Sequence, residues 1–285
     1  MKKFYICLLA CMLIAGMTGC VVAVNSPSVN RYDEAEKYAS GNFSYAAEGI
    51  TRVEADWVAG SITVVQSEEG TLKVEETGEL TEEQRLRWRL EDGVLKIQYC
   101  ASGYTGTFPA KSKALTLEVP VGIDLSIDSV SGQISLGDGS FGVLNLDTTS
   151  GKIDFGTVRA EVCKLDSVSG DITGDTLLCE KRLKADTTSG RVNIDWLEAP
   201  EAEAETVSGN ITVKLCRVQE AEIQSTSGSI TLILGETLGG ADVSFESASG
   251  SFHGDGYKVE SGRYIFGDGT CRIEAETVSG SLTVK

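Results

Sequence analysis

The sequence lacks most of what a catalytic site or a nucleic-acid-binding surface requires. It contains one histidine, His253, and no HExxH, GxSxG or glycine-rich phosphate-binding motif. It is also poor in basic residues, with 25 lysines and arginines against 42 acidic residues and a net charge of −17. Nucleic acids and anionic lipids both attract basic surfaces. We therefore expect no enzyme and no nucleic-acid binding, and a partner that is neutral or cationic.

Long apolar runs are also missing, except for a single one at the N-terminus. Lys2 and Lys3 precede the apolar stretch Phe4–Gly16, which is too short to span a bilayer, and Met17-Thr18-Gly19-Cys20 follows. A positive start, a short apolar run and small residues before a cysteine are typical of a bacterial lipoprotein signal. The pattern predicts that residues 1–19 are removed and that Cys20 is acylated, as with palmitate. The mature protein would then be anchored to the cell membrane on its extracytoplasmic face. An ordinary secretory signal is the alternative.

No CxxC pair occurs, so the cysteines do not indicate a zinc site or a dithiol redox site. Cys7 and Cys11 fall within the signal peptide, and Cys20 carries the lipid. Five cysteines then remain, and an odd number does not predict a disulfide framework. We expect these five to be small buried apolar side chains: Cys100, Cys163, Cys179, Cys216 and Cys271.

What the sequence does contain is an internal repeat built on Ser-Gly pairs. Eight pairs occur at steps of 19, 19, 20, 19, 19, 22 and 30 residues, each followed by a polar and then an apolar residue. The segment Val58-Ala59-Gly60-Ser61-Ile62 is a ninth, degenerate copy. The pairs are Ser131-Gly132, Ser150-Gly151, Ser169-Gly170, Ser189-Gly190, Ser208-Gly209, Ser227-Gly228, Ser249-Gly250 and Ser279-Gly280.

Apolar and polar residues alternate on both sides of each Ser-Gly turn. In the third unit, Cys163 and Leu165 alternate with Lys164 and Asp166 before the turn, and Ile172 follows it. This period of two places one set of side chains in a core and the other in solvent. The residues expected inside are Ile127, Leu146, Leu165, Ala185, Ala204, Ile223, Phe245 and Ala275 before the turn, and Ile134, Ile153, Ile172, Val192, Ile211, Ile230, Phe252 and Leu282 after it.

One unit of about 19 residues cannot bury its own apolar side chains, whereas parallel stacking of the units about 4.8 Å apart buries all of them. The sequence therefore predicts an all-β fold with a parallel β-solenoid over residues 121–285. We expect glycine at each turn because the backbone angle there is one that side chains avoid. An antiparallel β-sandwich is the alternative, since it also has short strands at even spacing.

The region before residue 121 has a different pattern. Residues 20–49 comprise the lipidated Cys20 and a tether. Residues 50–120 predict antiparallel β-structure, with alternation around Trp88, a hairpin turn at Asp92-Gly93 and a strand at Ala114–Val119. We expect this region to cap the end of the solenoid, where an exposed edge would otherwise aggregate. At the other end, the longer last step predicts a hairpin that contains Gly254-Asp255-Gly256 and Gly267-Asp268-Gly269.

Several segments together resemble a family of bacterial β-strand-repeat lipoproteins known as "putative adhesin", a domain of unknown function. The segments are Tyr32–Tyr38, Asp56–Val64, Lys113–Pro120 and the run of Ser-Gly repeats, so the resemblance covers nearly the whole mature chain. It implies a cell-envelope protein, and some members are linked to envelope-stress systems. It implies no catalytic residues, because the family offers none to transfer.

The residue after the last core position before the turn is acidic in every unit but one. Parallel stacking would align these residues in a column, named here the acidic ladder, with like charges about 5 Å apart that repel by about 0.8 kcal/mol each in water. Two interpretations are open. Each carboxylate could accept hydrogen bonds from its own turn, as Asp147 from Ser150-Gly151, or the ladder could bind divalent cations such as Ca²⁺ or cationic peptides. The ladder comprises Asp56, Asp128, Asp147, Asp166, Asp186, Glu205, Glu246 and Glu276, with Gln224 as the exception.

Two other sets of polar residues are candidate binding surfaces. A column after the turn, the polar ladder, could bind a glycan through its hydroxyl groups or consist of ordinary exposed strand residues. The arginine stripe, Arg85, Arg87 and Arg89 with Trp88, is the only dense basic cluster. It could dock a wall polymer, pair with the acidic ladder, or be a solvated strand face. The polar ladder comprises Thr63, Ser135, Asp154, Thr173, Asn193, Thr212, Thr231, His253 and Thr283.

These observations predict a non-enzymatic, monomeric, lipid-anchored envelope protein. We expect it to act as an adhesin-like scaffold or binding module for a cell-wall polymer or another envelope protein. A sensor or decoy for cationic peptides is one alternative, because the ladder is acidic. A glycan-active enzyme on a β-helix is another, although fold alone is weak support for an activity. No cofactor is expected apart from Ca²⁺ on the ladder.

Overall fold

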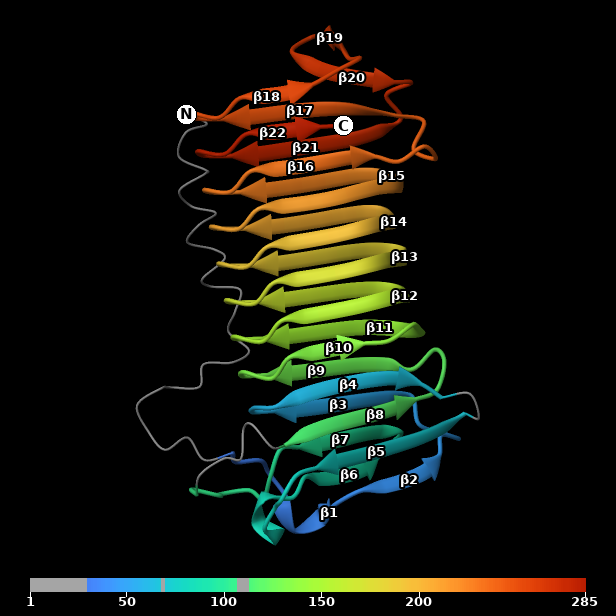
Figure 1. The fold of residues 1–285 in the computed structure, drawn as a ribbon. Helices are drawn as coiled ribbons and strands as arrows, with labels where there is room; N and C mark the ends of the chain where they lie inside the picture. The colour runs from blue at the N-terminus through green and yellow to red at the C-terminus, as the bar shows by residue number, and fades with distance from the viewer. Residues whose placement is uncertain (1–29, 68–69, 107–112) are drawn as a thin grey trace.

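The computed structural model describes residues 30–67, 70–106 and 113–285. The predicted signal peptide, Cys20 and the first part of the tether lie outside the described residues. The described chain is all-β, and its twenty-two strands join one sheet (Figure 1). Two short 3-10 helices, η2 (Ala35–Lys37) and η3 (Glu82–Gln84), accompany the strands. No helix in this part of the chain is long and apolar enough to cross a membrane.

The strands fall into three groups along the chain. The N-terminal group comprises β1 (Ala39–Ser40), β2 (Phe43–Ala46), β3 (Arg52–Trp57), β4 (Ser61–Gln66), β5 (Thr71–Thr77), β6 (Arg87–Glu91), β7 (Val94–Gln98) and β8 (Ala114–Val119). The central group comprises β9 (Asp124–Ser129), β10 (Ile134–Leu136), β11 (Gly139–Thr148), β12 (Ile153–Ser167), β13 (Ile172–Thr187), β14 (Val192–Thr206), β15 (Ile211–Ser225) and β16 (Ile230–Leu234). The C-terminal group comprises β17 (Gly240–Ser247), β18 (Phe252–Gly254), β19 (Lys258–Glu260), β20 (Arg263–Gly267), β21 (Cys271–Thr277) and β22 (Leu282–Val284).

The central strands stack in parallel, one repeat above another (Figure 1). β12 pairs with β11 on one side and with β13 on the other, and β14 and β15 continue the series. Equivalent residues stay together, so that Leu165 lies opposite both Leu146 and Ala185. Each long strand has an irregularity midway, as between Ala160 and Val162, and one repeat, called a rung here, contributes to two faces around the core. The predicted parallel solenoid is confirmed, and the antiparallel sandwich is excluded.

The predicted core columns are buried in every rung except the outermost one. Phe245 in β17 and Phe252 in β18 are only partly buried, because no further rung covers them. The other predicted core residues are at most 3% exposed. The five cysteines are buried as predicted and add to this apolar interior.

A buried hydroxyl group ties five of the eight Ser-Gly turns to the neighbouring rung. Thr187 accepts a hydrogen bond from the Gly190 N–H at 3.0 Å and donates one to the Gly170 carbonyl at 3.3 Å. The same two bonds recur at Ser167, Thr206, Ser225 and Thr277. A Cβ atom on Gly190 would lie 1.9 Å from the Gly170 carbonyl oxygen, so close stacking requires glycine. None of the eight Ser-Gly glycines has a left-handed φ, so the backbone-angle explanation is wrong.

The N-terminal end of the stack departs from chain order. β3 and β4 pair in parallel with β9 and β10 on one side and with β7 and β8 on the other. They are therefore inserted between two rungs that follow them in the chain. β5 and β6 pair antiparallel with β8 and β7, and β1 and β2 extend this cap. The predicted cap and its Asp92-Gly93 hairpin are confirmed, but residues 50–120 are only partly antiparallel because they include two parallel rungs.

The C-terminal end contains a similar insertion. β21 and β22, the last strands of the chain, pair with β15 and β16 on one side and with β17 and β18 on the other. β17 and β18 therefore form the outermost rung, although the chain continues after them. The predicted hairpin is present as β19 and β20, and β20 also pairs with β17. The division of the chain at residues 19, 49 and 120 stays a prediction.

Candidate functional site

The register of the solenoid aligns the whole acidic ladder in one column. Asp166 lies opposite Asp147 and Asp186, and the next rung places Glu205 beside Asp186. Neighbouring strands lie about 4.8 Å apart, so the column is about 43 Å long. The strand register confirms the predicted alignment of the ladder, and Gln98, which the sequence did not assign to it, extends the column at the N-terminal end. The ladder positions follow in the order Asp56, Asp128, Asp147, Asp166, Asp186, Glu205, Gln224, Glu276 and Glu246.

The ladder carboxylates do not bond their own turns among the described residues. The turn N–H that the sequence assigned to Asp147 belongs to Gly151, and it donates instead to the Thr148 hydroxyl at 3.0 Å. One oxygen of Asp166 and one of Asp186, Oδ1 in both cases, are buried without a hydrogen-bond partner. The hypothesis that turn hydrogen bonds offset the repulsion is therefore wrong, because hydroxyl groups take those donors.

Two lysines offset part of the charge in the middle of the ladder. Lys164 contacts Asp166, and Lys184 contacts Asp186 with an N–O distance of 3.1 Å. Each lysine lies two residues before the carboxylate and points to the same face. In the described part of the chain, Asp128, Asp147 and Glu205 have no comparable ion pair, so the ladder keeps a surplus of negative charge.

Burial and mutual repulsion raise the pKa values of the ladder. Burial, followed by the neighbouring carboxylates, raises the pKa of Asp128 to about 6 and the pKa of Glu205 to about 7. Burial also raises the pKa of Asp186 to about 6, although Lys184 opposes this shift. Burial raises the pKa values of Asp147 and Glu276 as well. The charge of the ladder therefore changes between pH 5 and pH 8.

One part of the ladder has the geometry for a cation. Carboxylate oxygens of Asp186, Glu203 and Glu205 lie within 4.8 Å of one another. Such oxygens are the ligands that Ca²⁺ prefers. Lys184 already contacts Asp186 and Glu203, so a metal ion would compete with its ammonium group. Ca²⁺ binding stays a prediction, and these three carboxylates are where it would occur.

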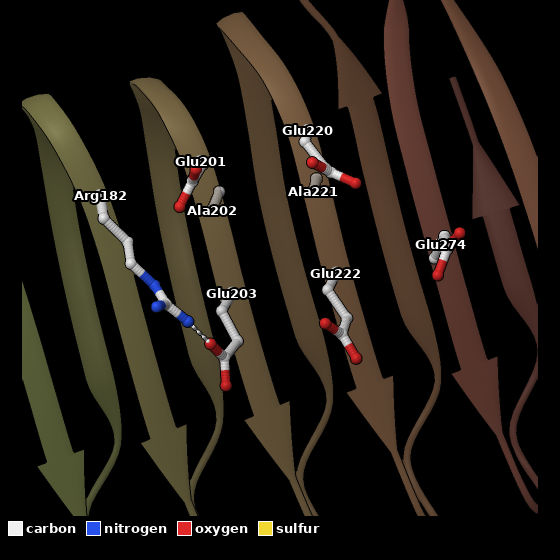
Figure 2. Close-up of a pocket in the computed structure, with 8 residues that line it drawn as sticks. All are labelled: Arg182, Glu201, Ala202, Glu203, Glu220, Ala221, Glu222 and Glu274. Atoms are coloured by element: carbon white, nitrogen blue, oxygen red, sulfur yellow. Dashed lines mark hydrogen bonds and ion pairs between the residues drawn. The ribbon is translucent and has the colours of Figure 1, made fainter.

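An acidic hollow of about 290 Å³ adjoins the ladder over β13, β14, β15 and β21. Figure 2 shows that its glutamates come from successive strands and that Arg182 reaches toward Glu203. Arg182 is the only basic side chain among the described residues that line the hollow, and this ion pair engages it. The hollow opens to solvent. Repeated carboxylates in rows suit the binding of cationic groups better than they suit a convergent catalytic site. The hollow is lined by Arg182, Glu201, Ala202, Glu203, Glu220, Ala221, Glu222 and Glu274.

The polar ladder is also a single column. Asp154 lies opposite both Ser135 and Thr173, and the pairing runs from Thr63 to His253. His253 is exposed, as expected for an outward strand position. The polar ladder follows the turn whereas the acidic ladder precedes it, so the two lie on different faces. Glycan binding by this column stays a prediction.

All three arginines of the arginine stripe pair with glutamates of the N-terminal cap. Arg87 Nη1 lies 2.9 Å from Glu82 Oε1, and Trp88 packs on Phe43 with ring centroids 4.1 Å apart. The stripe therefore pairs within the cap rather than with the acidic ladder, and little of its charge is free to dock a polymer. The pairs are Arg85–Glu82, Arg87–Glu82, Arg89–Glu34 and Arg89–Glu91.

Comparison with known protein families matches residues 50–285 to Toastrack DUF4097. The chain belongs to the Toastrack DUF4097 family. The match spans both inserted rungs, the acidic ladder and all of the Ser-Gly repeats. The family assignment confirms the resemblance to adhesin-like repeat proteins that the sequence indicated.

Two solved structures are similar to this chain at low sequence identity. A "putative adhesin" from Parabacteroides distasonis is 14% identical, with 87% of this chain and 97% of that chain covered and a TM-score of 0.50. A second "putative adhesin", from Bacteroides fragilis, is also 14% identical, with the same coverage of 87% and 97% and a TM-score of 0.48. At this identity the likeness concerns the fold alone. A comparison with curated proteins found no match.

A second column, which was not identified from the sequence, lies beside the acidic ladder on the same face of the solenoid. Each of its residues precedes a ladder residue by two positions. Its members pair in register from Lys164 through Lys184 to Glu203, and then to Glu222 and Glu274. The period of two that identified the ladder also predicts this column. The outward residues of this face form two parallel columns. In the second column, lysines lie beside one part of the acidic ladder and neutralise it, and glutamates lie beside the other part and add to its negative charge.

We expect the Toastrack stack to become more stable as the pH falls from 8 to 5. A carboxyl group whose pKa is raised by folding destabilises the fold while ionised, and this cost disappears as the pH falls through the folded pKa. The pKa values of Asp128 and Asp186, about 6, and of Glu205, about 7, lie in this window. Glu203 has a lowered pKa and stays ionised there. Thermal unfolding at low salt should show a gain of about 2 kcal/mol, or about 5 °C in Tm.

The substitution Glu205→Gln copies the Gln224 of the next rung and removes one of these carboxyl groups. It should raise Tm at pH 8 and flatten the dependence of Tm on pH. Glu201→Gln, an exposed position on the same strand, should leave that slope unchanged. A Tm that decreases on acidification, or equal slopes for the two variants, would refute the assignment.

Proposed function

We propose that this Toastrack protein is a non-enzymatic, lipid-anchored scaffold of the cell envelope that binds its partner along the acidic ladder. The observation that carries the proposal is the continuous register of the acidic ladder through nine rungs, eight of which carry a carboxylate. A column of this length suits a partner with a repeat of its own, because nearly every rung presents the same kind of group. A cell-wall polymer that carries amino groups, or a basic segment of an envelope protein, has this chemistry.

The distribution of polar groups favours binding over catalysis. The acidic ladder repeats carboxylates in most of its rungs, whereas an active site brings different groups to one point. His253 is exposed at the end of the polar ladder, and Arg182 is engaged by Glu203. An adhesin-like role agrees with the names given to the structural relatives, and a glycan-active enzyme gains no support from these side chains.

The N-terminal cap constrains where the lipid anchor would lie. Asn30 donates a hydrogen bond to the Cys100 carbonyl at 3.3 Å, within the cap. An extended segment of ten residues, the separation between Cys20 and Asn30, spans at most about 35 Å. An acylated Cys20 would therefore keep this end of the stack near the membrane. Labelling with a palmitate analogue tests the anchor: the wild type should be labelled and Cys20→Ser should not.

Co-sedimentation of residues 21–285 with purified cell-wall sacculi tests the scaffold role. Binding that EDTA abolishes would indicate a metal bridge between ladder and wall. Binding that resists EDTA but is lost at high salt would indicate direct contact with amino groups. Absence of binding in both conditions would overturn the wall-scaffold form of the proposal.

A sensor or decoy for cationic peptides is the second candidate. It is favoured by the hollow, where Glu220, Glu222 and Glu274 gather beside the ladder. An oligolysine peptide should then bind with an affinity that falls steeply with salt, whereas an oligoglutamate peptide should not bind. Equal behaviour of the two peptides would exclude this role.

A further inference from the structure

The outermost rungs at the two ends of the parallel stack are covered to different extents by antiparallel strands. At the N-terminal end, the outermost rung consists of β7 and β8. β6 covers the whole of β7, from Val94 to Gln98, and β5 covers β8 from Ala114 to Glu118. The backbone groups at this edge therefore meet antiparallel strands, and the cap closes the end of the solenoid.

At the C-terminal end, the outermost rung is covered over only part of its length. β20 pairs with β17 from Gly240 to Val243, and the remaining residues Ser244–Ser247 pair only with β21. β18 pairs only with β22 among the described strands. The outer edge of Ser244–Ser247 therefore presents backbone donors and acceptors without a neighbouring strand, whereas β18 lies against the hairpin, with the Tyr264 and Phe252 ring centroids 3.6 Å apart. The hairpin of β19 and β20 lies at this end of the stack (Figure 1).

The side chains of this rung show the same incomplete coverage. Phe245 and Phe252 are partly buried, whereas Ala275 and Leu282, their partners in the rung below, are at most 1% exposed. Val259 in the adjacent hairpin is 62% exposed. The apolar column that ends at Phe245 thus reaches the surface without a strand above it. By contrast, Tyr257 and Tyr264 of the hairpin pack on Phe252 and cover the other column.

We propose that the edge at Ser244–Ser247 binds an extended polypeptide strand from another protein, which pairs with this half of β17. The exposed row of backbone groups suits pairing with a β-strand, because an extended polypeptide has hydrogen-bond donors and acceptors at the same spacing. The interface would continue the one that already joins β17 to β21. An apolar residue of the partner would cover Phe245, and a basic residue would face Glu246, since the column there already sets Glu246 beside Glu276.

This edge lies at the end of the stack, whereas the acidic ladder runs along its side. The proposal is therefore independent of the proposed function, and either can fail without the other. Because Glu246 is the last member of the ladder, the charge of a partner strand at that one position provides a direct test.

The probe is a fluorescent peptide with the sequence of residues 220–232, a rung of this chain, in which Gln224 is replaced by Lys. It should bind residues 21–285 at least tenfold more tightly than the same peptide with Glu at that position. Ile223→Pro in the peptide should abolish binding, because proline removes a backbone donor. Hydrogen exchange should slow at Ser244–Ser247 when the Lys peptide is bound.

The variant Glu246→Lys provides the matched control. Glu246 is exposed, so the substitution should leave the fold intact, and it should reverse the preference so that the Glu peptide binds more tightly. Absence of binding by both peptides, or protection elsewhere on the protein, would overturn the proposal. Concentration-dependent protection of Ser244–Ser247 without peptide would also overturn it, because the occupant would then be a second copy of the chain.

Discussion

Gly209→Ala is expected to destabilise the solenoid by about 3 kcal/mol or more, lowering Tm by about 6–12 °C. A Cβ atom at this position would lie 1.6 Å from the Gly190 carbonyl oxygen. This oxygen belongs to the backbone, so it can move only if the turn that contains Gly190 moves with it. Relief of the clash would separate two rungs and weaken the hydrogen bond from the Thr206 hydroxyl to Gly190, now 3.2 Å. Urea unfolding of wild type and variant measures the loss.

Gly137→Ala is the matched control for this substitution. The nearest atom to a Cβ at Gly137 is the Val64 carbonyl oxygen at 3.6 Å, an ordinary contact, and its φ is not left-handed. The change in stability should therefore stay within about 0.5 kcal/mol. Equal losses for both glycines would show that backbone flexibility, rather than the close approach of neighbouring turns, determines the requirement for glycine.

Lys113→Met is expected to destabilise the N-terminal cap by about 3–5 kcal/mol, because it leaves a buried carboxylate without its partner. Lys113 Nζ lies 2.9 Å from Glu76 Oε2, and the exposed fractions of the two side chains are 0% and 1%. The ammonium group also donates to the Gln84 carbonyl at 2.6 Å and lies 4.2 Å from the centre of the Tyr99 ring. Denaturant unfolding should show the loss.

The double variant Lys113→Met/Glu76→Gln separates the buried charge from general damage to the cap. Removing the second charge should restore at least half of the lost stability, since glutamine can still accept the Leu86 N–H, which lies 2.9 Å from Glu76. A double variant less stable than Lys113→Met alone would mean that packing around Lys113, rather than its charge, holds the cap together.

The central rungs could be predicted from sequence because two periods agree there. The alternation of two fixes which residues point inward, and the step of about 19 residues fixes which of them share a column. Asp147, Asp166 and Asp186 therefore came out in the correct register. The chemistry of the ladder was less accessible, because Thr148 and Ser167 compete with the carboxylates for the turn N–H groups.

The order of rungs at both ends could not be predicted from the repeat. β3 lies between β7 and β9, and β21 lies between β15 and β17, so strands adjacent in space are not adjacent in sequence. The repeat pattern identifies the members of a column but carries no information on their order when the chain leaves the stack and returns. The arginine stripe was ambiguous for a related reason, since Glu34, which pairs with Arg89, lies 55 residues away in the sequence.

Lys113 is another exception to the repeat pattern, and it occurs because β8 lies at the end of the stack. Ala114 pairs with Ser61, so Lys113 stands opposite Gly60 in the column of turn glycines. In an inner rung the next carbonyl would exclude such a side chain. The outermost parallel rung has space for such a side chain. There the ion pair between Lys113 and Glu76 takes the place of the contact between a hydroxyl group and a turn glycine that the inner rungs have.

The central claim, that the acidic ladder is the binding surface, is tested most directly by sacculus co-sedimentation of two variants of residues 21–285 with equal net charge. One neutralises the ladder with Asp128→Asn, Asp147→Asn, Glu205→Gln and Glu276→Gln. The other neutralises four exposed acidic residues elsewhere with Glu48→Gln, Glu79→Gln, Asp255→Asn and Glu260→Gln. We predict that the ladder variant binds at least tenfold more weakly than wild type and that the other stays within twofold. Equal binding by the two variants would contradict the claim.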